Sequence, residues 1–119
     1  MQRNRRSGRR GDQTGMDIQP IREQISRGTY YWRQHAIQRS IERGIRDEEV
    51  VEALCNGEII EEYLEDKYGP SCLVLGRTSA GRPLHVQCSL PPTVWIITLY
   101  EPDPQEWIEF RTRKGRSNL

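Results

Sequence analysis

The stretch that decides the fold is LHVQCSLPPTVWIITLY, residues 84–100. Every second residue from Leu84 to Cys88 is apolar, which is the period of a strand with one buried face. Two prolines then interrupt the pairing, and residues 93–100 are apolar on both faces, as in a central strand that is covered on both sides. These residues therefore predict two strands of a small sheet.

Two more strands are expected before this stretch. Residues 58–66, EIIEEYLED, and residues 72–77 are rich in β-branched and other apolar side chains and flank turn residues at 66–70. Residues 78–81 form a hairpin loop that leads into the strand at 84–89. The four segments together predict a four-stranded antiparallel sheet.

Three helices are expected ahead of the sheet. Asp17 caps a first helix that Gly28 ends, Gly44 ends a second at residues 32–43, and Asp47 caps a third that stops at Asn56 and Gly57. The residues predicted to face the core are Ile18, Ile21 and Ile25 in the first, Ala36, Ile37, Ser40 and Ile41 in the second, and Val50, Val51, Ala53 and Leu54 in the third. The sequence thus predicts an α+β fold with N-terminal helices packed on the antiparallel sheet.

The ends of the chain differ from this body. Residues 1–15 are rich in arginine and predict a disordered basic tail, residues 16–110 a single α+β domain, and residues 111–119 a basic C-terminal tail. Within the domain, Asp103 and Pro104 are expected to open a short terminal helix that carries Trp107 and Phe110.

The net charge of +1 conceals an uneven distribution. Residues 1–15 and 111–116 each carry a net charge of +4, so the rest of the chain carries −7. Nine acids lie between Asp47 and Asp66 without one Lys or Arg among them. An acidic surface between basic ends suits a chain that meets a basic partner and a phosphate backbone, although a solvated surface explains many such runs.

Other features exclude several functional classes. The three cysteines, Cys55, Cys72 and Cys88, are odd in number and lack metal-site spacing, which favours a reducing cytoplasm over a disulfide framework. No apolar stretch reaches the roughly 20 residues of a membrane helix. Glycine-rich phosphate loops, serine-hydrolase motifs and zinc ligand sets are missing, so we expect no cofactor and no metal.

One row of polar residues on the second helix is a candidate site. His35, Arg39 and Arg43 are spaced i, i+4 and i+8, so their side chains share one side of the helix. Arginine offers a fixed fork of donors to phosphate oxygens, and histidine titrates near neutral pH. The alternative is a structural role, in which Arg39 and Arg43 pair with the acidic stretch at 47–66.

Three further candidates belong to the sheet. His85 lies on the strand face opposite Leu84, and Arg82 starts the same strand. Tyr100 ends the last long strand and, like Tyr68 in the turn, offers a ring for stacking and a hydroxyl. Each of these residues also fits a purely structural role.

Several separated motifs resemble one known family. They are HAIQRSIERGIRDEEVVEALCNGEIIEEY at 35–63, DKYGPSCLVLGRTSAGRPLHV at 66–86 and IITLYEPDPQEW at 96–107. In this order they resemble the bacterial family of domain of unknown function 4258, with its HAxxR, RGI and RPLH motifs. That family is in turn similar to the RelE-like RNase toxins of toxin–antitoxin pairs.

The resemblance implies a function. A RelE-like toxin cuts RNA without a metal and is covered by an antitoxin protein, so the expected partners are RNA and a cognate antitoxin. His35 and His85 would then transfer protons, Arg39, Arg82 and Arg43 would bind phosphate, and Tyr100 would orient a base or the leaving oxygen. The alternative is a non-catalytic module that binds protein or nucleic acid.

Overall fold

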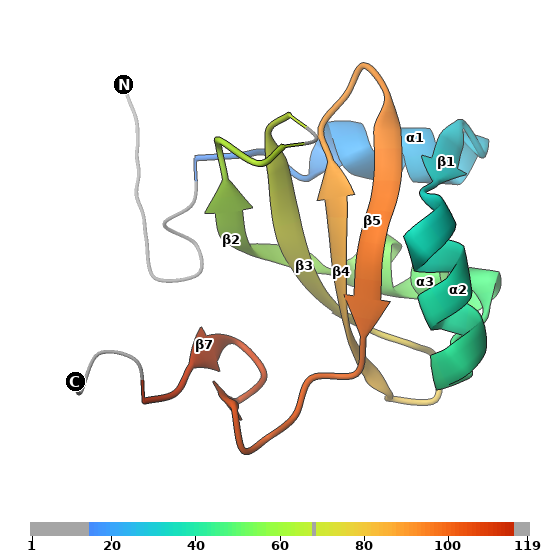
Figure 1. The fold of residues 1–119 in the computed structure, drawn as a ribbon. Helices are drawn as coiled ribbons and strands as arrows, with labels where there is room; N and C mark the ends of the chain where they lie inside the picture. Colours follow the sequence, from blue (N-terminus) through green and yellow to red (C-terminus); the bar gives the residue numbers. More distant parts are fainter. Residues whose placement is uncertain (1–14, 68, 116–119) are drawn as a thin grey trace.

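The computed structural model of the chain describes residues 15–67 and 69–115, so most of the expected N-terminal tail, Tyr68 and residues 116–119 lie outside the described residues. Within the described ranges the chain forms three helices and seven strands (Figure 1). The helices are α1 (Gln19–Arg27), α2 (Gln34–Arg43) and α3 (Asp47–Asn56). The strands are β1 (Tyr30–Trp32), β2 (Glu58–Tyr63), β3 (Ser71–Arg77), β4 (Pro83–Ser89), β5 (Val94–Tyr100), β6 (Trp107–Ile108) and β7 (Thr112–Arg113).

The ends of α1 and α2 follow the expected glycine signals, whereas the N-cap of α1 is Ile18 rather than the predicted Asp17. Gly28 and Gly44 end α1 and α2 in the left-handed conformation, with φ of 75° and 63°, which glycine adopts at little cost. At the start of α3 the N-cap is Arg46 rather than the predicted Asp47, because the Glu49 carboxylate accepts a hydrogen bond from the Arg46 backbone N–H at 2.9 Å.

The sheet has five strands and is mixed, so the prediction of a four-stranded antiparallel sheet was wrong. Its order is β1-β5-β4-β3-β2, in which β1 runs parallel to β5 and the other neighbours are antiparallel. The sequence did not predict β1, because a strand of three residues between two helices is too short to show the alternation of apolar and polar side chains. Because β1 occupies one edge, β5 lies inside the sheet as expected, while β4 is the middle strand.

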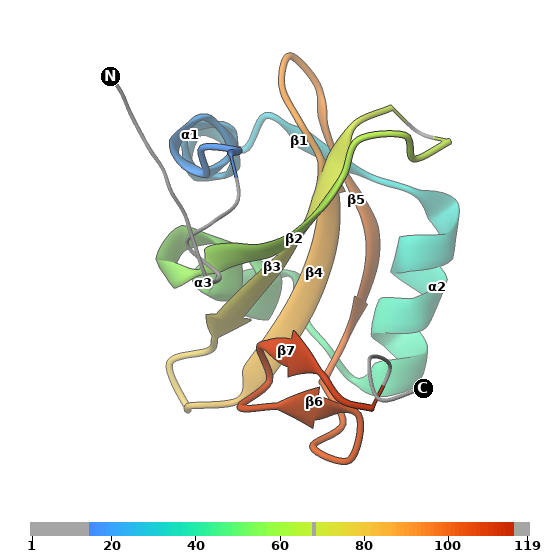
Figure 2. The ribbon, with the colours of Figure 1, turned by 90° about the vertical axis from the view of Figure 1, so that its left-hand side faces the viewer.

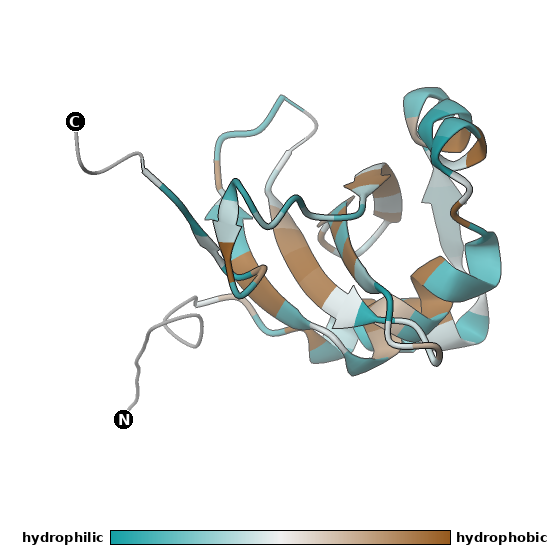
Figure 3. Cartoon of the chain, turned by 90° about the horizontal axis from the view of Figure 1, so that it is seen from below, coloured by the Kyte–Doolittle hydropathy of each residue, from teal (hydrophilic) through white to brown (hydrophobic). Residues whose placement is uncertain are grey.

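Helices α1 and α3 cover one face of this sheet (Figure 2). Val50, Ala53 and Leu54 of α3 are buried there as predicted, in one cluster with Ile21 and Ile25 of α1. Figure 3 shows how the hydrophobic residues concentrate along the strands, whereas the helices carry both kinds of residue. This face holds the main core.

Helix α2 packs differently from its prediction. Only Ala36 of its predicted apolar face is buried, while Ile37 and Ile41 are 46% and 75% exposed. These isoleucines are exposed because α2 lies along the β5 side of the sheet instead of across a face (Figure 1). Only a narrow stripe of the helix therefore packs against the sheet.

The opposite face carries a smaller cluster under the C-terminal hairpin. The predicted terminal helix is wrong, because after one turn at Asp103 the chain extends into the hairpin β6–β7. The hairpin places Trp107 and Phe110 on Leu73 and Leu75 of β3. Packing both aromatic rings against the sheet favours the hairpin over the helix that the Asp-Pro pair predicted.

The hairpin also corrects the predicted basic tail. Arg111 pairs with Glu58, and Arg113 pairs with Glu61 at 2.8 Å. The folded chain therefore extends beyond residue 110, because two of the expected tail arginines have carboxylate partners on β2. Separately, none of the described helices has the length and apolar content to cross a lipid bilayer.

A close contact between α3 and β3 gives a test of the packing. A Cβ added to Gly76 would lie 1.9 Å from the Ala53 carbonyl oxygen, so Gly76→Ala must push α3 away from the sheet. Overpacking of this kind costs about 3 kcal/mol or more in free energy of unfolding, measurable by urea denaturation. Gly15→Ala is the control, since its nearest neighbour would be 3.9 Å away. Equal stability of both variants would contradict the described contact.

Candidate functional site

The face of the sheet away from α1 and α3 is only partly covered, and we call it the open face. It carries Gln87 and His85 of β4, Tyr100 of β5 and Glu61 of β2, with the hairpin β6–β7 over one end and α2 along one side (Figures 1 and 2). His85 lies opposite Leu84, as the strand alternation predicted, and Leu84 belongs to the main core. Polar groups from distant segments therefore meet on one surface.

His85 is fully buried at the end of the open face. Its Nε2 lies 2.6 Å from the Phe110 carbonyl oxygen, and its Nδ1 lies 3.3 Å from the Tyr100 hydroxyl. Since a carbonyl oxygen only accepts, Nε2 carries the proton and Nδ1 accepts from Tyr100. The geometry thus fixes one neutral tautomer.

Burial lowers the pKa of His85, and three neighbours modify the effect. The hydrogen bond to Phe110 and the charge of Glu61 oppose the lowering, whereas the charge of Arg113 adds to it. The rings of Trp107 and Tyr100 stand edge-on to the imidazole, with centroids 4.4 Å and 5.3 Å away. His85 is therefore uncharged at neutral pH and closed off by aromatic rings.

Tyr100 is the more accessible member of this pair. It is half-buried and stands directly opposite His85 in the register of β4 and β5. Burial raises the pKa of Tyr100, while the positive charges of Arg113 and Arg43 oppose that change. Its hydroxyl therefore remains protonated at neutral pH and donates to His85, which leaves the oxygen lone pairs available to a second group.

Arg43 reaches the same place from the last turn of α2. Its Nη1 donates to the Leu99 carbonyl oxygen at 2.7 Å, directly before Tyr100 in the chain. The residue is exposed, and its positive charge acts on the Tyr100 hydroxyl. This combination supplies a fixed positive charge next to a positioned hydroxyl.

Arg82 is close by but engaged with protein groups. Its guanidinium contacts Glu101 at 3.0 Å and Glu49 at 3.3 Å, and also donates to the carbonyl oxygens of Arg43 and Gly44. A hydrogen bond from the Arg46 backbone lowers the pKa of Glu49, which keeps that carboxylate ionised. Arg82 thus fastens the start of β4 to the turn after α2, and its position favours a structural role.

His35 and Arg39 lie apart from this cluster. His35 is exposed in the first turn of α2, and its eight-residue separation from Arg43 corresponds to about 12 Å along the helix axis. Arg39 pairs with Glu42 at 3.1 Å, not with the acidic stretch at 47–66. The structure therefore brings together Arg43, Arg82, His85 and Tyr100, but not the two remaining candidates.

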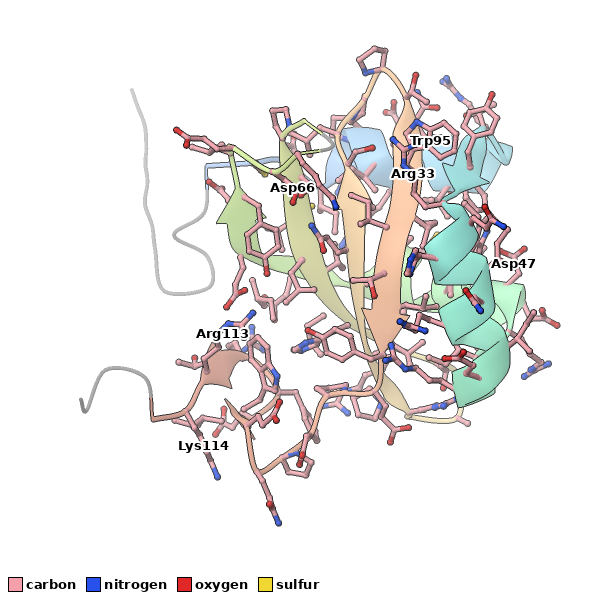
Figure 4. All side chains as sticks on the ribbon, in the orientation of Figure 1. Arg33, Asp47, Asp66, Trp95, Arg113 and Lys114 are labelled. Atoms are coloured by element: carbon pink, nitrogen blue, oxygen red, sulfur yellow. The ribbon has the colours of Figure 1, made fainter. Side chains whose placement is uncertain are left out.

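The opposite end of the open face carries residues that sequence reasoning missed. The guanidinium of Arg33 stacks 4.2 Å from the centre of the Trp95 ring, and Tyr31 lies against Trp95 at 5.2 Å (Figure 4). A hollow of about 370 Å³ beside them is lined by Ser89 and the loop at 90–93. The exposed aromatic residue in the Tyr-Tyr-Trp run was the available signal, but its partner Trp95 is distant in the sequence.

Comparison with known families identifies the family of the chain. The sequence model of the family described as "Domain of unknown function (DUF4258)" matches residues 32–101. The chain belongs to this family. Neither the search of curated proteins nor that of solved structures found a match to the chain. The DUF4258 region includes all six candidate residues, whereas the hairpin that covers His85 lies beyond it.

The buried histidine predicts a pH dependence of stability. The folded-state pKa of His85 lies below its ordinary value of 6.5, so below that pH the unfolded chain binds more protons. The free energy of unfolding should fall as the pH drops below about 6.5, by at most about 1.4 kcal/mol per pH unit. Urea denaturation between pH 5.5 and pH 7.5 measures this fall.

The two histidines of the chain provide a matched pair of variants. His85→Gln should remove the pH dependence relative to wild type, whereas His35→Gln, which changes the exposed histidine, should retain it. A wild-type stability that stays level below pH 6.5, or a His85→Gln variant with the wild-type slope, would contradict the description of His85.

Proposed function

We propose that this protein is a metal-independent endoribonuclease of the toxin kind, with single-stranded RNA lying on the open face. The observation that carries the proposal is the meeting of Arg43, Tyr100 and His85, which come from α2, β5 and β4. Cleavage of a phosphodiester needs a positive charge beside a proton acceptor, and these three residues supply both.

The proposed reaction uses the RNA 2′-hydroxyl as the nucleophile. Its proton passes to the Tyr100 oxygen as the Tyr100 proton passes to Nδ1 of His85, while the 2′-oxygen forms a bond to phosphorus. Arg43 stabilises the negative charge on the phosphate. The bond from phosphorus to the 5′-oxygen then breaks, and that oxygen takes a proton from water. His85 returns its proton through Tyr100 to solvent, leaving a 2′,3′-cyclic phosphate and a 5′-hydroxyl.

The rest of the open face would hold the RNA. Arg33 and Trp95 offer a platform on which a base can stack. His35 and Arg39 would line the side that α2 forms. In this proposal His85 accepts a proton through Tyr100, and Arg82 positions Arg43 through its backbone. A RelE-like architecture, a cytoplasmic location and a covering antitoxin belong to the same proposal.

A direct assay tests the cleavage. Purified full-length protein should cut fluorescent single-stranded RNA in the presence of a chelator. Tyr100→Phe removes the oxygen that takes the proton, and Arg43→Gln removes the charge, so each should slow cleavage by about 100-fold or more. Arg27→Gln, an exposed change on α1, should cut like wild type. Circular dichroism checks that each variant is folded.

The second candidate is a module that binds RNA without cutting it. The complete burial of His85 and the ion pairs of Arg82 favour this alternative. Fluorescence anisotropy separates the two functions, because a pure binding module retains RNA while leaving it intact. Wild-type protein that binds but fails to cut RNA at any pH from 5 to 9 would rule out the nuclease.

A further inference from the structure

Three arginines line a hollow at the start of β2. Arg22 comes from α1, Arg77 from the end of β3 and Arg111 from the turn of the β6–β7 hairpin. The hollow has a volume of about 410 Å³, and Asn56 and Glu58 also line it. We call it the arginine hollow. Arg22 and Arg77 were not candidates in the sequence, whereas Arg111 was expected only as part of the basic C-terminal tail.

The backbone around the hollow is held in place by the protein itself. Asn56 donates from Nδ2 to the Arg77 carbonyl oxygen at 2.8 Å and accepts from the Arg77 N–H at 3.1 Å. The guanidinium of Arg77 lies 5.5 Å from the centre of the Phe110 ring and has no carboxylate partner among the described residues. Arg77 is thus anchored at its backbone while its charge remains available to a ligand.

Arg22 and Arg111 are fixed in other ways. Nη2 of Arg22 donates to the Gly57 carbonyl oxygen at 2.5 Å, and its buried Nε finds no hydrogen-bond acceptor in the part of the chain that the structure describes. Arg111 forms an ion pair with Glu58. Three guanidinium groups against one carboxylate leave the arginine hollow with a charge of about +2.

We propose that the arginine hollow binds a phosphate monoester. Such a group carries a charge of about −1.5 to −2 at pH 7 and several acceptor oxygens, which match the surplus charge and the donors of the three arginines. The volume of the hollow falls within the usual range for small-molecule sites, so a nucleoside attached to the phosphate fits as well. This site does not depend on the proposed cleavage, and its test uses no RNA.

Isothermal titration calorimetry of the full chain with AMP, adenosine and inorganic phosphate tests the proposal. AMP should bind at least about tenfold more tightly than adenosine, because only AMP carries the phosphate. Tighter binding of AMP than of inorganic phosphate assigns the site to a nucleotide, and equal binding assigns it to the phosphate group alone. Equal binding of AMP and adenosine, or no binding of AMP at millimolar concentration, overturns the proposal.

Variants of the lining residues locate the binding. Arg77→Gln and Arg111→Gln should each weaken AMP binding by about tenfold or more, since each removes a charge-assisted hydrogen bond. Glu58→Gln removes the opposing carboxylate and should strengthen binding. Arg27→Gln, which changes an exposed arginine of α1 outside the hollow, should bind like wild type. If Arg77→Gln binds AMP as tightly as wild type does, the arginine hollow is not the site.

Discussion

The hydrogen bond from Nε2 of His85 to the Phe110 carbonyl oxygen governs the open face. It places the only imidazole proton on Nε2, so Nδ1 must accept from Tyr100. It also fastens the hairpin to the sheet at a turn in which Glu109 and Phe110 both have positive φ, a conformation that non-glycine residues rarely adopt. The local backbone strain and the orientation of Tyr100 therefore depend on the same contact.

Charges that are separated in the sequence are matched in space. The acidic run at 47–66 has no basic residue of its own, yet Glu49, Glu58 and Glu61 each pair with an arginine from a later segment. The acidic run therefore attaches later segments of the chain, which are the start of β4 and the C-terminal hairpin, instead of forming an isolated acidic surface. Pairing removes part of the charge asymmetry that suggested a basic partner.

Local signals predicted most of the elements but little of their arrangement. Glycine caps and alternating strands gave three helices and four strands close to their observed bounds, because those signals act over a few residues. The parallel β1, the exposed Ile37 and Ile41, and the C-terminal hairpin depend on tertiary contacts instead. The site was predictable to a similar degree: helix spacing placed His35 and Arg43 on one side of α2, about 12 Å apart, but only the folded sheet brings Arg43 to Tyr100.

The parallel pairing of β1 with β5 has a consequence for synthesis on the ribosome. Tyr30 pairs with Val94, a partner 64 positions later in the chain. At about 5–20 residues per second, roughly 3–13 s pass between the translation of these two residues. During that interval β1 cannot form its hydrogen bonds to β5. The edge strand β1 is therefore made before the strand that it pairs with, and this edge of the sheet closes only after β5 has been translated.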